Sequence, residues 1–377
     1  MKRILVARAG EHLAVSFTRA LRAGSEPLHL VGLDSDEFAL QRAEVEERRL
    51  VPRVEEEDYI PILCGIIRET RPDLLCVLTG KEMLSISAAR ERLDVCTFLP
   101  RHETLRLLES RADSYERCRQ AGVPVPRSVL INNEADLRRA FTDVGEHLWL
   151  RNVEAFWCQS SLTVSDLDMA RAWIDLFGIW GSCIAVEPLL RNTVVWESVW
   201  SGGELVAAQG TKRLYWEFAR VTPSGVSGIT GAGETVANAQ VDEMALQAIK
   251  AIDPRPNGIF SVDLAYDQHG GLMVTEVNSG GFTSGSVAVY AAGGVNMPYI
   301  SVKVALGEMQ DLPAPLVNPS PEGVVSVHGM DIEPVITNMG YINRFEEELR
   351  SRRMSVRSGA GTSSADPRLA RDSASAE

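Results

Sequence analysis

The chain has 377 residues, a formal net charge of −13, and hydrophobic and charged contents of 45% and 24%. These values are typical of a globular protein with two or three domains. The acidic balance argues against a nucleic-acid partner, because surfaces that bind phosphate backbones gather Lys and Arg. No apolar run approaches the roughly 20 residues that span a bilayer, so no membrane partner is expected.

The N-terminal residues and the cysteines both favour a cytoplasmic protein. The apolar stretch at residues 1–8 is too short, and too soon interrupted by charge, for a signal peptide. The six cysteines are scattered, form no Cys-x-x-Cys pair and have no His nearby at ligand spacing. We therefore expect reduced thiols and no structural zinc site.

The first hundred residues alternate strand patterns with helical patterns. They predict strands over residues 4–7, 28–33 and 73–78, and helices over residues 11–23, 59–70 and 82–92. Such repetition predicts a small parallel sheet. Asp34 lies where a ribose-binding carboxylate would be expected, which makes a Rossmann-like nicotinamide site an alternative. The first turn, Arg8-Ala-Gly10, carries one glycine where that site needs three, so we do not favour it.

After Pro100 the pattern changes to short strands mixed with helices. A helix is expected over residues 102–121, ended by Gly122-Val-Pro-Val-Pro126, because proline enforces extended backbone. Further strands are expected over residues 148–150, 183–187, 193–200 and 204–209, and further helices over residues 166–177 and 234–252. The last helix carries apolar residues at helical spacing, which indicates core packing.

A β-hairpin is the most informative element of the sequence. Its arms carry Asp263 on one side of a glycine-bearing turn, and Glu276 and Asn278 on the other. Residues two apart in a strand share a face, and the turn length brings Asp263 within about one register step of Glu276. Two carboxylates and an amide oxygen crowded together favour a hard cation, Mg²⁺, with Mn²⁺ as an alternative. The competing interpretation is an ordinary hairpin with polar residues on its wet face.

The order of these elements resembles the ATP-grasp family. Asp263, Glu276 and Asn278 match the magnesium ligands of that family, and the segment from Ser110 to Pro126 is similar to its helix that ends in Ala-Gly-Val-Pro-Val-Pro. The segment Glu187, Pro188, Leu189 and Leu190 matches the interlobe strand whose backbone binds adenine. The resemblance therefore implies an ATP- and magnesium-dependent enzyme.

The resemblance also implies a fold that combines α/β and α+β parts. We expect a Rossmann-like pre-ATP-grasp domain over residues 1–100, a small lobe over 101–190 and a large lobe with the metal site over 191–312. Residues 313–350 would form a C-terminal segment with a strand near Val324 and a charged helix over 341–353. This segment either closes the N-terminal sheet or forms a homodimer contact. Residues 351–377 are rich in Ser and Gly and are expected to be a disordered tail.

Several positions depart from the family pattern. Arg111 and Arg151 stand where most members have lysines that neutralise the phosphates, and the loop at 152–161 lacks the usual glycines. Phe156 and Trp157 in that loop either cover the nucleotide as a lid or simply pack. Gly281 lies where members commonly place an arginine, so the chemistry needs another cation. The candidates are Lys212, Arg213 and Arg220, unless their segment is only a strand and loop with solvated charges.

The reaction that the resemblance implies is the ATP-dependent joining of a small carboxylate to an amine through an acyl phosphate. The segment after the hairpin resembles the acceptor pocket of D-alanine:D-alanine ligases, with Ser279, Gly280, Gly281, Thr283 and Ser284. An amino acid is the expected acceptor, because its carboxylate could pair with Arg213 or Arg220. Glu197 is our candidate for the ribose hydroxyls; the alternative is an exposed strand carboxylate.

Other functions stay open at this stage. A catalytically impaired relative that binds nucleotide or a protein partner would explain the lost lysines and glycines. Carboxylation or carbamate phosphorylation would require bicarbonate and a partner subunit or biotin carrier, and the chain has no Met-Lys-Met biotin-attachment sequence. The glycines between Pro223 and Gly233 predict a mobile loop beside the pocket, or a plain linker.

Overall fold

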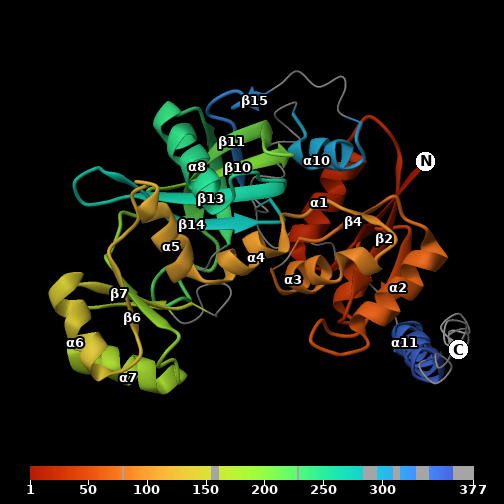
Figure 1. Cartoon of the computed structure of the whole chain (residues 1–377), viewed down its shortest axis with the longest axis horizontal. Helices are drawn as coiled ribbons and strands as arrows, with labels where there is room; N and C mark the ends of the chain where they lie inside the picture. The colour runs from red at the N-terminus through yellow and green to blue at the C-terminus, as the bar shows by residue number, and fades with distance from the viewer. Residues whose placement is uncertain are drawn as a thin grey trace, which may run out of the picture.

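A computed structural model of the chain contains three β-sheets with helices packed around them (Figure 1). It describes residues 1–78, 80–153, 161–226, 229–282, 295–308, 315–327 and 339–359. The expected mixture of a parallel sheet with mixed α+β parts is confirmed. Among the residues described, no helix combines the length and the hydropathy that crossing a bilayer demands.

The N-terminal sheet is parallel, as the sequence predicts, with strand order β3-β2-β1-β4-β5. Its strands are β1 (Lys2–Val6), β2 (Leu28–Asp34), β3 (Glu47–Leu50), β4 (Leu74–Cys76) and β5 (Cys96–Thr97). The helices beside it are α1 (His12–Arg22), α2 (Tyr59–Thr70) and α3 (Gly80–Ala88), with single 3₁₀ turns at Ala39–Arg42 and Arg90–Arg92. Apolar side chains alternate between two cores, one on each face of the sheet, which is why the strands are apolar throughout.

The single helix expected over residues 102–121 is in fact two helices, α4 (His102–Glu109) and α5 (Arg111–Gln120). Ser110 separates them, because its backbone is extended (φ −95°, ψ 105°) and its hydroxyl accepts a hydrogen bond from Asp113 N at 3.2 Å. This is an N-cap, which begins a new helix. The break makes Arg111 the first residue of α5, and α5 packs against α8 (Ala239–Ile252) and β14 (Leu272–Ser279).

A smaller antiparallel sheet follows, with strand order β6-β9-β7-β8. Its strands are β6 (Ser128–Ile131), β7 (Leu148–Asn152), β8 (Ser161–Val164) and β9 (Cys183–Val186). Two helices, α6 (Glu134–Asp143) and α7 (Leu167–Phe177), share one apolar core with it. Arg151 lies near the end of β7, at the edge of this core.

The large sheet carries the hairpin and has the order β14-β13-β10-β11-β12-β16. Its further strands are β10 (Thr193–Ser201), β11 (Glu204–Trp216), β12 (Thr230–Val236), β13 (Gly258–Tyr266) and β16 (Val325–Val327), and β15 (Leu316–Val317) pairs with β11. The expectation of a helix from residue 234 is wrong at its start: Glu234 belongs to β12, and Asn238 caps α8 at residue 239. Gly231 and Gly233 are likewise in β12, not in a loop.

The C-terminal elements divide between two parts of the molecule. β16 extends the large sheet, whereas α11 (Met339–Gly359) packs on β3 and α2 of the N-terminal part (Figure 1). Another helix, α10 (Met297–Ala305), packs on α1. α11 extends to Gly359, so residues 351–359 of the expected disordered tail are helical, while residues 360–377 lie outside the described part.

Candidate functional site

The hairpin brings the three expected metal ligands together. β13 and β14 pair antiparallel, with Asp263 directly opposite Glu276, and Asn278 opposite Ser261 one pleat away. Asn278 Nδ2 lies 3.5 Å from Asp263 Oδ2. The carboxylates and the amide therefore share one face of the large sheet, while Val277 on the other face packs in the core beneath α8.

A β-bulge at Thr275 makes this arrangement possible. The register shifts there, because Leu264 pairs with Val274 while Asp263 pairs with Glu276. The extra residue reverses the alternation, so that Glu276 is on the face opposite Val274. The freed carbonyl of Thr275 accepts hydrogen bonds from Arg111 Nη1 at 2.9 Å and Tyr115 Oη at 2.8 Å, which fastens α5 to the hairpin.

Glu276 is held by both arginines that stand in place of the expected lysines. Arg111 Nη2 donates a short hydrogen bond to Oε1, and Arg151 Nη1 donates to Oε2 at 3.5 Å. The side chains of Arg111 and Arg151 are only 10% and 13% exposed. Burial acts to raise the pKa of Glu276, but the two guanidinium charges outweigh it and lower the pKa to about 2. Glu276 is therefore ionised at neutral pH.

Of the three candidate cations, Arg213 reaches the hairpin. Its Nη2 lies 2.5 Å from Asp263 Oδ1, its Nε donates to Thr230 Oγ1 at 3.0 Å, and its guanidinium lies 4.6 Å from the centre of the Trp216 ring. Lys212, its neighbour in β11, points to the opposite face of the sheet, and Arg220 is exposed in the turn after that strand. Arg213, the positively charged partner of Asp263, is thus held by three contacts.

The segment Glu187–Leu190 connects the small sheet to the large one. The Glu187 carboxylate accepts hydrogen bonds from Arg127 N at 2.7 Å and Arg127 Nε at 3.0 Å. The N–H of Glu187 donates to Arg127 O, and that of Leu190 donates to Tyr266 O, at 3.0 and 2.8 Å. Pro188 has no N–H, so Leu189 carries the other backbone donor of this segment.

Glu197 is not the exposed strand carboxylate that one interpretation of the sequence gives. It is fully buried at the centre of β10, opposite Gln209 of β11 and Ser261 of β13. Its partner Ser261 lies two residues before Asp263 in β13, so Glu197 is on the same face of the sheet as Asp263. Its role in binding the ribose stays a prediction. Burial in the middle of a sheet depends on strand order, which the local sequence does not contain.

The residues after the hairpin meet the N-terminal part of the molecule. Gly280 has φ 96°, and a Cβ there would lie 1.9 Å from Met83 Sδ of α3; a Cβ on Gly281 would lie 3.0 Å from Leu78 O. The two glycines therefore allow a close approach of α3, and of the residue Leu78 before it, to the end of β14. The other expected pocket residues, Thr283 and Ser284, and the expected lid residues, Phe156 and Trp157, lie outside the described residues.

The donor set of the hairpin fits a hard divalent cation. Asp263, Glu276 and Asn278 offer oxygen atoms, the ligands that Mg²⁺ prefers. Asp263 Oδ1 is buried, and its contact with Arg213 Nη2 is an ion pair that lacks the alignment of a hydrogen bond. Among all the residues that the structure describes, no three His, Cys, Asp or Glu side chains gather at ligand spacing. A metal here would thus combine two carboxylates with the amide and with ligands from outside the protein.

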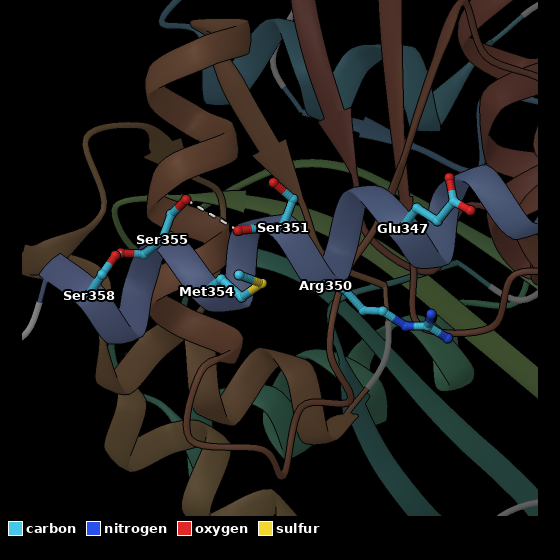
Figure 2. Close-up of a pocket in the computed structure, with 6 residues that line it drawn as sticks. All are labelled: Glu347, Arg350, Ser351, Met354, Ser355 and Ser358. Atoms are coloured by element: carbon cyan, nitrogen blue, oxygen red, sulfur yellow. Dashed lines mark hydrogen bonds between the residues drawn. The ribbon is translucent and has the colours of Figure 1, made fainter.

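Other polar features of the molecule lie elsewhere. Figure 2 shows a shallow hollow lined by six residues of α11 alone, from Glu347 to Ser358, where Ser355 Oγ donates to Ser351 O at 3.2 Å. At the carboxyl end of the parallel strands, buried Asp34 accepts a hydrogen bond from Gly10 N. Nearby, Glu82 is 6% exposed and accepts one from Tyr59 Oη at 2.8 Å; burial raises its pKa to about 7.

Sequence reasoning missed the residues that orient the site. Tyr115 and Ser110 were parts of an expected continuous helix. Thr230 lay in an expected loop or linker, and Trp216 lay in a segment expected to be a substrate pocket or a strand and loop. The signal for Ser110 was present, since Ser followed three residues later by Asp is typical of a helix start. Tyr115 contacts Thr275, 160 residues away, and Thr230 contacts Arg213, 17 residues away. No local sequence pattern indicates either contact.

Comparison with known proteins finds similarity of structure. No protein-family model matches the sequence, and no curated protein matches it. N5-carboxyaminoimidazole synthetase from Staphylococcus aureus, solved with ADP, superposes with a TM-score of 0.66 at 12% identity, covering 93% of this chain and 96% of that chain. Biotin carboxylase from Campylobacter jejuni gives 0.63 at 16%, covering 87% and 74%. An L-amino acid ligase from Bacillus licheniformis gives 0.63 at 17%, covering 89% and 78%. At these identities the likeness concerns the fold.

Proposed function

Because this chain has the ATP-grasp fold, we propose that it is an ATP-dependent ligase that joins a small carboxylate to an amine. The observation that supports this most is the hairpin, which gathers Asp263, Glu276 and Asn278 on one face with arginines on both carboxylates. A plain structural hairpin gains nothing from burying two carboxylates, because desolvation makes such charges costly.

The nucleotide would lie between the small and large sheets. Arg111 and Arg151 would contact the phosphates, for which a guanidinium offers paired donors. Since the other N–H groups of the connecting segment are engaged, we assign the adenine contact to the Leu189 backbone. Asp263, Glu276 and Asn278 would hold Mg²⁺, which neutralises charge on the phosphates during transfer.

The proposed reaction has two steps. An oxygen of the substrate carboxylate attacks the γ-phosphorus of ATP, and ADP leaves, which gives an acyl phosphate. The amine nitrogen then attacks the acyl carbon and loses a proton, and inorganic phosphate leaves as the amide forms. Arg213 holds Asp263 in place and Lys212 points to the opposite face of the sheet, so Arg220 is left as the candidate for the carboxylate of an amino-acid acceptor.

The test is ADP release by the purified protein with ATP, magnesium and panels of acids and amines. We expect turnover that requires both an acid and an amine, and a loss of about 100-fold or more in Glu276→Gln, as when a group that stabilises transferring charge is removed. The control is Glu204→Gln, an exposed carboxylate at the far end of β11, which should keep full turnover. Unchanged turnover in Glu276→Gln would contradict the proposal.

Two other outcomes of the same assay are informative. Turnover that depends on bicarbonate would favour a carboxylation, the chemistry named for the Campylobacter and Staphylococcus structures. Magnesium-ATP that raises the thermal midpoint without any ADP release would favour a nucleotide-binding relative without ligase activity. One observation favours such a relative: arginines already neutralise both hairpin carboxylates.

A further inference from the structure

We propose that Arg111 and Arg151 form a latch on Glu276 that the nucleotide opens, so that the divalent ion binds tightly only after ATP has engaged the arginines. The inference rests on the proposed nucleotide site and concerns the order in which its ligands bind. The latch consists of these three side chains, from α5, β7 and β14.

The latch connects the large sheet with α5 and with the small sheet. Arg111 reaches Glu276 from α5, which is fastened to the large sheet through Thr275 and Tyr115. Arg151 reaches it from the small sheet, so the Arg151–Glu276 contact crosses from one sheet to the other. At 3.5 Å the Arg151 contact is at the outer limit of a hydrogen bond, so it is the weaker half of the latch.

The charges at the site favour an anion before a cation. Both oxygens of Glu276 face guanidinium groups, and Asp263 faces a third, so three arginines surround the two hairpin carboxylates. A divalent ion that approaches Glu276 alone must displace positive groups from a half-buried carboxylate. A polyphosphate instead attracts those groups to itself, which leaves the Glu276 oxygens available as ligands.

Arginine is what makes the latch firm. Its planar fork lets Arg111 hold Thr275 O with Nη1 and Glu276 with Nη2 at once. A lysine in the same place carries one ammonium and would hold one partner at a time, although its charge is the same. Substitution by lysine therefore separates the effect of the fork from the effect of charge.

The experiment measures Mn²⁺ binding by the electron paramagnetic resonance of the free ion, with and without a non-hydrolysable ATP analogue. For the wild type we expect weak binding of Mn²⁺ alone and tight binding with the analogue. Arg111→Lys, which breaks the fork, and Arg151→Gln, which removes the charge that faces Oε2, should each tighten the binding of Mn²⁺ alone by roughly tenfold, within the usual range of coupling between two ligands. Glu276→Gln should lose the metal bound by the protein in both conditions, after subtraction of the Mn²⁺ that the analogue chelates by itself.

The matched control is Arg352→Lys on α11, away from the hairpin. Arg352 holds both carboxylate oxygens of Glu69, which lies on α2. This variant should bind Mn²⁺ as the wild type does. Equal affinity for Mn²⁺ alone in the wild type and in a folded Arg151→Gln would overturn the latch, whether or not Arg111→Lys folds. Titration of the analogue in EDTA and in magnesium then separates the two proposals: if it binds in either condition, only the latch has failed, and if it binds in neither, the nucleotide site has failed.

Discussion

At the scale of single residues, the pKa values of Glu276 and Glu82 are shifted in opposite directions, although burial acts to raise both. The arginines keep Glu276 ionised, whereas Glu82 accepts a hydrogen bond from Tyr59 Oη and burial raises its pKa from 4.5 to about 7. A raised acid pKa means that the folded protein binds more protons than the unfolded chain between these values, so stability is lost as the pH rises from about 4.5 to 7. Glu82→Gln removes that loss and should be on the order of 2 kcal/mol more stable than the wild type at pH 8, with little difference at pH 4.5. Urea unfolding at both pH values measures this, and an equal difference at both would show that Glu82 does not titrate there.

At the scale of elements, the break between α4 and α5 is what aims Arg111 at the hairpin. Ser110→Ala removes the hydroxyl that accepts from Asp113 N and should cost about 1 kcal/mol of stability. Asn133→Ala removes the equivalent cap of α6, where Asn133 Oδ1 accepts from Asp136 N at 3.0 Å, and should cost about the same. Only Ser110→Ala should also weaken nucleotide binding, because α6 carries no group of the site. Chemical unfolding and calorimetric titration check the pair, and parallel effects of the two variants on binding would contradict the role given to the break.

At the scale of the whole molecule, the C-terminal helix stabilises the N-terminal part without touching the site. Phe345 of α11 is 2% exposed and packs in the core of α2 and the parallel sheet. Phe345→Ala should cost about 3–5 kcal/mol, as truncations of buried phenylalanine do. Met354 on the same helix is 72% exposed, and Met354→Ala should change stability by less than about 0.5 kcal/mol. The nucleotide affinity of the folded fraction should be unchanged in both, and a large change with Phe345→Ala would mean that α11 communicates with the hairpin.

The sequence was informative where local patterns carry the signal. Alternating strands and helices predicted the parallel sheet, and the turn residues predicted the pairing of β13 with β14. It was poor where a contact joins distant segments, as with the burial of Glu197 between two other strands or the pairing of Arg213 with Asp263. It was also wrong at Glu234, whose place in β12 is decided by pairing with β11 and not by the helical pattern that follows.

The bulge at Thr275 has a consequence for how this strand tolerates change of length. Because Leu264 pairs with Val274 and Asp263 with Glu276, deletion of Thr275 would leave a regular strand that keeps Glu276 and Asn278 on the face of Asp263, but it would remove the carbonyl that holds Arg111 and Tyr115. A point substitution removes one ligand, whereas this single-residue gap keeps all three and loses the anchor of α5. In any alignment of this strand with another, the placement of one gap thus decides whether the two polar positions correspond.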